Sequence, residues 1–186
     1  MAKLTLSSLL LLPVLGCVTP AAADDDATYT RTIVRFADDG SSTVTTEPIT
    51  ASEQRLEHEA AVAAVAGVQA GAKQHALAID SCGDWYATKF FDQTDYTGDE
   101  LCLIGLGDGF LDAYCRLHYG TKGACLRTWS ESARSLWTGE SELSMESVYG
   151  AGTCAGGIVE SWPAYEAVAT LDACMQVADQ FWIYTQ

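Results

Sequence analysis

Six of the seven cysteines and all five tryptophans lie within residues 82–186. Residues 24–80 contain neither residue type. This shift in composition predicts a boundary near residue 80, with a cysteine-rich domain over residues 82–186. The preceding residues 24–80 are interpreted as a small accessory or pro-segment, or alternatively as a helix packed permanently on the second domain.

The first 23 residues have the features of a secretory signal peptide. Lys3 is followed by the apolar run from Leu4 to Gly16, and Ala21-Ala22-Ala23 ends the segment. The apolar run is too short to span a bilayer, so we expect no transmembrane segment in the mature chain. Cleavage after Ala23 is one expectation. The other is that Val14-Leu15-Gly16-Cys17 is a lipoprotein cleavage box and that Cys17 is lipidated. Both place the protein outside the cytoplasm, in an extracellular or periplasmic location.

Loss or lipidation of Cys17 leaves six cysteines, an even number that predicts three disulfides in an exported chain. The six are Cys82, Cys102, Cys115, Cys125, Cys154 and Cys174. Sequence alone allows about 15 connectivities, of which the simplest is sequential: Cys82–Cys102, Cys115–Cys125 and Cys154–Cys174. A zinc site is the competing interpretation, but no pair has CxxC spacing and no histidine accompanies the cysteines.

The segment from Phe90 to Cys102 predicts a strand, a folded-back polar turn around Tyr96 and a second strand. Gly98 is expected to adopt a positive φ, which residues with a Cβ resist. Further strands are predicted at 114–119, 124–129, 133–137 and 181–184, and a glycine turn at 105–109. Strands of this length and spacing favour a β-sandwich.

Residues 24–80 predict a β-hairpin followed by a helix. Strands are expected at 29–36 and 42–49, joined by the turn residues Asp38-Asp39-Gly40. Thr50 and Glu53 have the spacing of a capping box, which predicts a helix over 51–70. One helical stripe consists of Leu56, Ala60, Ala63 and Gly67. Because these side chains are mostly small, we expect the helix to dock weakly. Residues 73–80 are interpreted as a linker.

A faint internal repeat accompanies the hairpin. Met145 precedes Gly152 by seven residues, as Phe91 precedes Gly98, and Cys102 and Cys154 follow those glycines. This spacing predicts two Greek-key units, the second lacking the aromatic residue. Chance agreement is the competing explanation.

The stretch from Cys82 to Gln186 resembles a bacterial βγ-crystallin-like domain, and in particular the secreted metalloproteinase inhibitors grouped with that fold. The likeness is carried by the Phe91…Gly98 hairpin, by Trp129-Ser130-Glu131 and by Ser135. The resemblance implies a mainly β, disulfide-bonded double Greek-key sandwich, here preceded by a small hairpin and helix, with a non-enzymatic role.

The resemblance also implies a calcium site, because family members bind calcium through paired Asp/Asn residues followed by Ser/Thr-Ser. The matching positions here are Ser130, Glu131, Arg134 and Ser135. Arg134 would place a cation where a ligand oxygen belongs, so we expect only weak calcium binding and assign no metal ligand.

Charge and motifs exclude several other functions. The chain has 25 acidic and 10 basic residues, and no Lys/Arg cluster suited to nucleic acid or an anionic membrane. His58-Glu59 begins like a zinc-protease helix, but Val62 replaces the second histidine, so we expect an exposed helix residue. Asp92, Asp95, Asp99 and Glu100 offer carboxylates for glycoside chemistry, although acids around one turn usually form a solvated loop. We therefore expect no catalytic residue and no cofactor.

The sequence thus predicts an exported, non-enzymatic binding protein, most specifically an inhibitor of a secreted protease. The alternative is a cell-envelope or matrix structural protein with weak calcium binding, and a small hydrolase using the acidic turn is the third hypothesis. An inhibitor must present a rigid loop, and the candidates are 105–109 and 138–144. Both carry acidic residues and would favour a basic or metal-containing cleft. The sequence identifies neither the target nor the oligomeric state.

Overall fold

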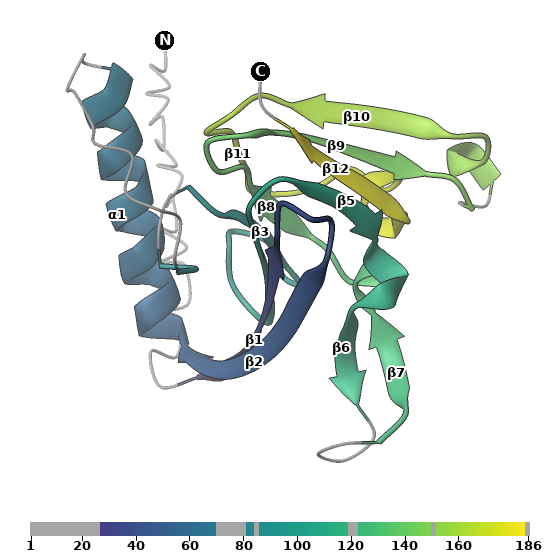
Figure 1. Ribbon diagram of the computed structural model, residues 1–186, viewed down its shortest axis with the longest axis horizontal. Helices are drawn as coiled ribbons and strands as arrows, with labels where there is room; N and C mark the ends of the chain where they lie inside the picture. Colours follow the sequence, from purple (N-terminus) through teal and green to yellow (C-terminus); the bar gives the residue numbers. More distant parts are fainter. Residues whose placement is uncertain (1–26, 70–80, 84–85, 119–122, 150–151, 185–186) are drawn as a thin grey trace, which may run out of the picture.

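The computed structural model describes residues 27–69, 81–83, 86–118, 123–149 and 152–184. The predicted signal peptide, Cys17 and the 73–80 linker lie outside these residues. The fold is mainly β, with one α-helix (Figure 1). The elements are β1 (Thr28–Phe36), β2 (Ser42–Thr50), α1 (Ala51–Gln69), β3 (Thr88–Phe91), β4 (Glu100–Ile104), β5 (Gly107–Phe110), β6 (Cys115–His118), β7 (Cys125–Thr128), β8 (Ser135–Trp137), β9 (Glu142–Ser147), β10 (Ile158–Trp162), β11 (Ala167–Val168) and β12 (Gln180–Tyr184).

Two sheets face each other across the main core. The first has the strand order β11-β8-β3-β4-β1-β2, and the second has the order β10-β9-β12-β5. All these pairings are antiparallel except β1 with β4, which is parallel. The core between the sheets contains Val34, Phe90, Leu101, Leu103 and Leu136 from the first sheet and Leu143, Met145, Phe181 and Ile183 from the second. Burial of these apolar side chains is the main favourable term for the sandwich.

The two halves of the sandwich repeat one strand arrangement. In the first sheet β3 lies between β8 and β4, and in the second sheet β9 lies between β12 and β10. Each half also places one strand in the other sheet, namely β5 and β11. The internal repeat predicted from the sequence aligns Phe91 with Met145, but these two residues do not occupy equivalent positions. Phe91 packs on the outer face of its sheet, against Trp137, whereas Met145 points into the core between the sheets.

The predicted β3–β4 hairpin is confirmed, and so is the conformation of its glycine. Gly98 has φ +93°, and a Cβ there would lie 2.0 Å from Oδ1 of Asp92. Ser135 on the neighbouring strand β8 holds the turn closed. Its Oγ accepts a hydrogen bond from the Tyr96 amide at 3.1 Å and donates one to the Gln93 carbonyl at 2.7 Å.

Residues 28–69 are joined to the cysteine-rich part by one continuous sheet. β1 pairs with β4 over Arg31–Arg35 and Glu100–Ile104, and Val34 belongs to the main core. The change in composition near residue 80 therefore does not separate two cores. Of the two interpretations of 24–80, permanent packing on the second part agrees with this geometry.

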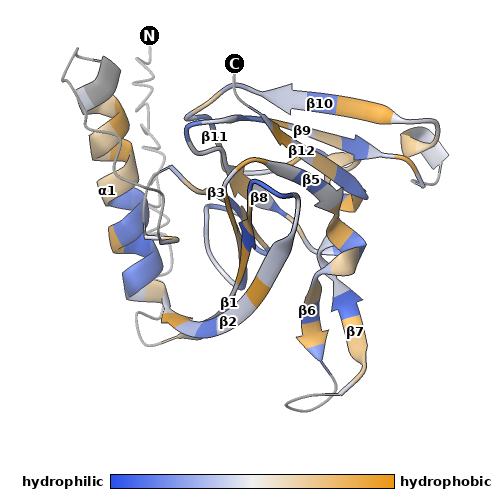
Figure 2. Ribbon diagram, viewed as in Figure 1, coloured by the Kyte–Doolittle hydropathy of each residue, from blue (hydrophilic) through white to orange (hydrophobic). Residues whose placement is uncertain are grey.

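Helix α1 begins as predicted, but it docks through a different face. The Thr50 amide donates to Oε2 of Glu53 at 2.7 Å, and the Glu53 amide donates to Oγ1 of Thr50 at 3.2 Å, which is the expected capping box. The prediction that α1 docks through the stripe containing Leu56 is wrong, because Leu56 is 60 % exposed. The buried positions are Gln54, Ala61 and Val65. Figure 2 shows why hydropathy misleads, since the half of α1 that carries Gln54 is hydrophilic.

Candidate functional site

The two loops expected to contact a protease are partly held within the second sheet and the core. Residues 107–110 form strand β5, which pairs with β12 and so closes the second sheet. In the other segment Thr138, Gly139, Ser141 and Ser144 are buried. Gly139 lies so close to the Tyr86 carbonyl oxygen that a Cβ would approach it to 1.5 Å. Inhibition through these segments stays a prediction, with Leu106 and Glu140 as exposed positions within them.

A hairpin formed by β6 and β7 is another accessible element among the described residues. β6 and β7 pair only with each other and extend away from the two sheets (Figure 1). The Cys115–Cys125 disulfide joins the two strands. We call residues 115–118 and 123–128 the arm. The strands and their connection were predicted, but the sequence interpretation gave the arm no functional role.

The arm is anchored to the body at its base. The guanidinium of Arg116 forms ion pairs with Asp92 and with Asp99, the latter at 3.3 Å. Both carboxylates belong to the folded turn between β3 and β4. Burial raises the pKa of Asp92, and the Arg116 charge opposes that shift. The acidic turn considered for hydrolysis thus positions the arm, since these two carboxylates share one arginine partner.

The outer surface of the arm combines apolar and basic side chains. Leu117 is 44 % exposed and Leu126 is 56 % exposed. His118 and Arg127 are also exposed. The ring Nδ1 of His118 donates to the Gly123 carbonyl at 3.1 Å, which ties the outer ends of the two strands together.

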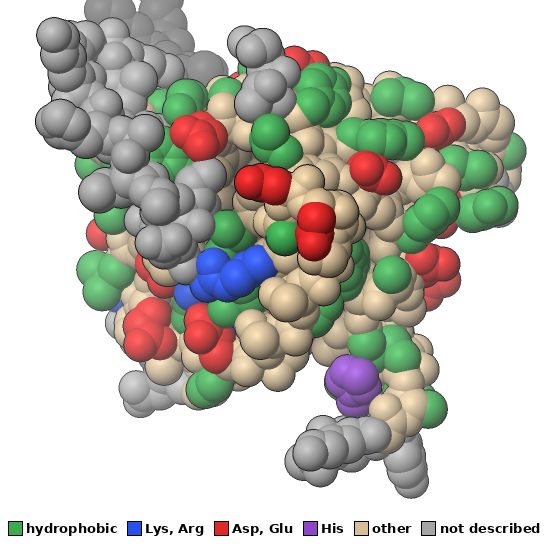
Figure 3. Space-filling view, in the orientation of Figure 1, with side chains coloured by type: hydrophobic (Ala, Val, Ile, Leu, Met, Phe, Trp, Pro, Cys, Tyr) green, Lys and Arg blue, Asp and Glu red, His purple; other side chains and the backbone are tan. Residues whose placement is uncertain are grey.

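The arm differs in charge from the rest of the chain. No Asp or Glu occurs from residue 113 to residue 130, although the chain carries 25 acidic residues and a net charge of −15. Figure 3 shows acidic side chains over the visible face of the body and none on the described part of the arm. The acid-free run is visible in the sequence, but it does not indicate that the two strands project from the body.

The segment compared with calcium-binding motifs contains an internal cation. The Arg134 guanidinium donates to the carbonyl oxygens of Ala133 at 2.9 Å, Glu131 at 3.2 Å and Gln176 at 3.5 Å. Ser135 is occupied with the β3–β4 turn. Backbone carbonyls are oxygen ligands that calcium uses. Here they are taken by the arginine.

We therefore expect no calcium site tighter than about millimolar. Thermal unfolding of the exported protein should show the same midpoint in excess calcium and in a chelator, because Arg134 supplies the positive charge in both. The measurement is calorimetric titration with calcium, with magnesium as the control. A micromolar calcium isotherm would contradict the expectation and would favour the structural-protein hypothesis.

A buried ionic cluster joins α1 to the outer face of the first sheet. Arg31 on β1 pairs with Glu100 on β4, with 2.9 Å between Nε and Oε1, and also with Glu57 on α1. Lys89 on β3 lies 3.2 Å from Glu57. The carboxylates of Glu100 and Glu57 raise the pKa of Arg31 although burial opposes this. The cluster fixes the helix, and each of its charges has a partner of opposite sign.

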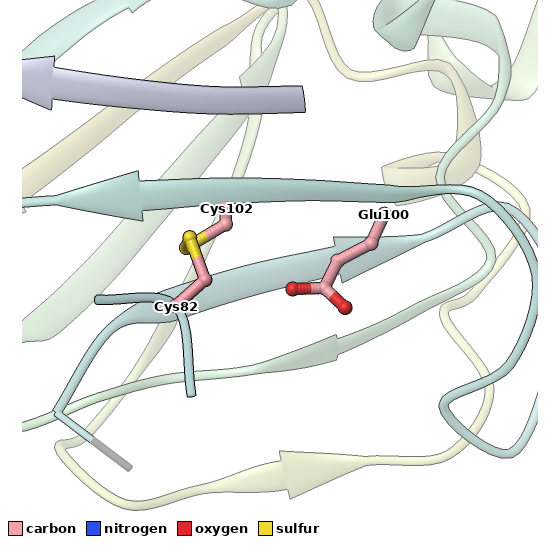
Figure 4. A group of neighbouring side chains, drawn as sticks. All are labelled: Cys82, Glu100 and Cys102. Atoms are coloured by element: carbon pink, nitrogen blue, oxygen red, sulfur yellow. A yellow bond between two sulfur atoms is a disulfide. The ribbon is translucent and has the colours of Figure 1, made fainter. Parts of the chain in front are cut away.

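One group of potential metal ligands occurs among the described residues, and its geometry argues against a metal. Figure 4 shows Cys82, Cys102 and Glu100, whose ligand atoms lie within 4.8 Å of one another. The two sulfur atoms are joined as a disulfide, so neither is a thiolate. The Glu100 carboxylate is held by Arg31. The other two disulfides are Cys115–Cys125 and Cys154–Cys174, so all three sequential pairs are confirmed.

His58 lies against aromatic rings and is only partly exposed. Its ring stacks on Tyr96 with 4.2 Å between centroids and meets Trp137 edge-on at 5.9 Å. Burial lowers the pKa of His58, and the nearby Lys89 charge adds to that shift. The expectation of an exposed helix residue is wrong. The ring packs α1 against the folded turn, a contact between segments that sequence spacing does not reveal.

Three disulfides favour an oxidising, extracellular setting. Within the described ranges, no helix has the length and apolar character needed to cross a membrane. No family model matches this chain, and a search of curated proteins finds no match.

Proposed function

We propose that this chain is an exported, non-enzymatic binding protein whose arm docks into a cleft of a partner protein, and that the partner is a secreted protease. The observation that carries the proposal is the disulfide-linked arm itself, which projects from the sandwich and exposes Leu117, Leu126 and Arg127. Such an element suits an inhibitor because its conformation is restricted before binding, which lowers the entropic cost of association.

The charge of the arm defines the kind of cleft that it fits. Arg127 and the exposed leucines would face the partner, while the acidic body around them disfavours contact with an acidic surface outside the cleft. Complementary charge gives specificity and faster association. The expected target is therefore a protease with an apolar, acidic cleft. This revises the basic or metal-containing cleft inferred from the acidic loops.

The strand arrangement supports the resemblance to βγ-crystallin-like inhibitors. Both halves have a three-stranded core of the same order, and each gives one strand, β5 or β11, to the opposite sheet. Ser135, one of the residues that carries the likeness, closes the β3–β4 turn through two hydrogen bonds. These features favour the non-enzymatic role that the resemblance implies.

The proposal predicts that arm variants lose inhibition without losing the fold. A panel of secreted metallo- and serine proteases is assayed with excess protein spanning residues 24–186. Leu126→Asp and Arg127→Glu should each weaken inhibition of the sensitive protease by about tenfold or more, as expected for exposed anchors that become buried on binding.

Leu56→Asp is the matched control, because Leu56 is 60 % exposed on α1 and lies outside the arm and outside residues 105–109 and 138–144. It should leave inhibition unchanged. Equal protease activity with and without the protein across the whole panel would reject the inhibitor proposal and favour an envelope or matrix structural role. The protein includes residues 24–80 because β1 pairs with β4 within the first sheet.

A further inference from the structure

Strand β2 is a long open edge of the first sheet. It pairs only with β1, and the sheet ends at β2. Every residue from Ser42 to Pro48 is exposed, and Val44 is 54 % exposed. Figure 1 shows β1 and β2 as a long, bent hairpin whose outer strand leads into α1. An edge of this length offers unpaired backbone groups to another strand, and proteins normally shorten, charge or cover such edges.

The register of the hairpin identifies the backbone groups that face outward. Pro48 has no N–H and lies opposite Thr30, so this pair is not hydrogen-bonded. At the other end of the hairpin, the Ala37 amide donates to the Ser41 carbonyl at 2.9 Å, so Ala37 and Ser41 form a hydrogen-bonded pair. Because antiparallel pairs alternate, Ser42, Val44 and Thr46 direct their N–H and C=O groups away from β1. Among the described residues these groups have no backbone partner.

The outward edge of β2 can pair with the same edge of a second copy. If a second β2 lies antiparallel with Val44 opposite Val44, then Thr43 lies opposite Thr45 and Ser42 opposite Thr46. These are apolar and hydroxyl pairs, which stabilise antiparallel strands. Glu47 would lie opposite Ser41, so the two glutamates of a pair would not face each other.

We propose that a second copy of this chain pairs with β2, forming a symmetric dimer with one continuous sheet through both molecules. A two-fold contact requires a surface complementary to itself, which the Ser42–Thr46 segment provides. Val44 would meet its counterpart at the axis, and the pairs at Ser42, Val44 and Thr46 would each exchange two backbone hydrogen bonds. The dimer goes beyond the proposed inhibition and does not depend on it.

The test is the mass of the protein in solution, measured by sedimentation between roughly 1 and 100 µM. The parent protein should reach the dimer mass within this range. Val44→Lys places equal charges opposite each other at the axis, and Val44→Pro removes one outward N–H while leaving the β1 pairing intact. Both variants should remain monomeric and folded by circular dichroism. Val159→Lys is the matched control, because Val159 is also 54 % exposed but lies on edge strand β10, and it should dimerise like the parent.

Amide hydrogen exchange gives a second readout. The amides of Ser42, Val44 and Thr46 should become slow as the parent concentration rises, whereas those of Thr43 and Thr45 are protected by β1 at every concentration. A parent that stays monomeric, a dimer that only Val159→Lys dissociates, or a dimer with fast exchange at Val44 would each overturn the proposal.

Discussion

Replacing Arg31 with methionine is expected to lower the free energy of unfolding by about 3–5 kcal/mol, the cost of leaving a buried charge without its partner. Glu100 would be that charge, since it is 1 % exposed and paired with Arg31. Its other side-chain partner, Gln54, is neutral and lies 3.3 Å away. Urea denaturation with a fitted midpoint and slope measures the loss.

The double variant Arg31→Met with Glu100→Met tests the cause. It removes one positive and one negative charge and leaves Lys89 paired with Glu57. We expect it to recover most of the lost stability, because an apolar pair of similar size often replaces a buried ion pair without net cost. Arg35→Met, on the same strand but exposed, should change stability by about 0.5 kcal/mol or less. Additive losses in the double variant would contradict the explanation.

The same cluster shows which parts of the fold the sequence could predict. The capping box at Thr50 and Glu53, the turn at Gly98 and the β3–β4 strands depend on neighbouring residues, and all three were predicted. The parallel pairing of β1 with β4 joins residues far apart in the chain and has no local pattern. The sequence did not predict the docking face of α1, because hydropathy assigns Gln54 and Glu57 to the solvent-facing side. In the structure Glu57 pairs with Arg31, and the Gln54 amide donates to Glu100.

The candidate site was harder to predict because turn composition does not report exposure. The glycines of residues 105–109 indicated a loop, but Gly107 and Gly109 pair with Ile183 and Phe181 in a sheet. Gly109 packs near the Phe181 ring, which a larger side chain would meet at 3.2 Å. For the arm, the sequence predicted the strands but not their exposure. Its strands were recognised, but projection from the body depends on the rest of the fold.

Reduction of the three disulfides is expected to unfold the sandwich under otherwise mild conditions. Each bridge closes a loop of 10 or 20 residues, and such loops contribute roughly 3 kcal/mol in the chain-entropy model. Together they match the whole stability of a typical domain. Thiol titration of the exported, unfolded but unreduced protein is the direct check. Six titratable thiols would contradict the disulfides.

The individual bridges should separate stability from binding. Replacing Cys82 and Cys102 with alanine should cost about 3 kcal/mol, because this buried bridge ties the chain before β3 to β4. Replacing Cys115 and Cys125 should leave the sandwich folded, since no residue of the arm belongs to the main core. That variant should nevertheless lose inhibition, because its arm is no longer restricted before binding. A folded variant without the arm bridge that inhibits as well as the parent would show that the arm is not the binding element.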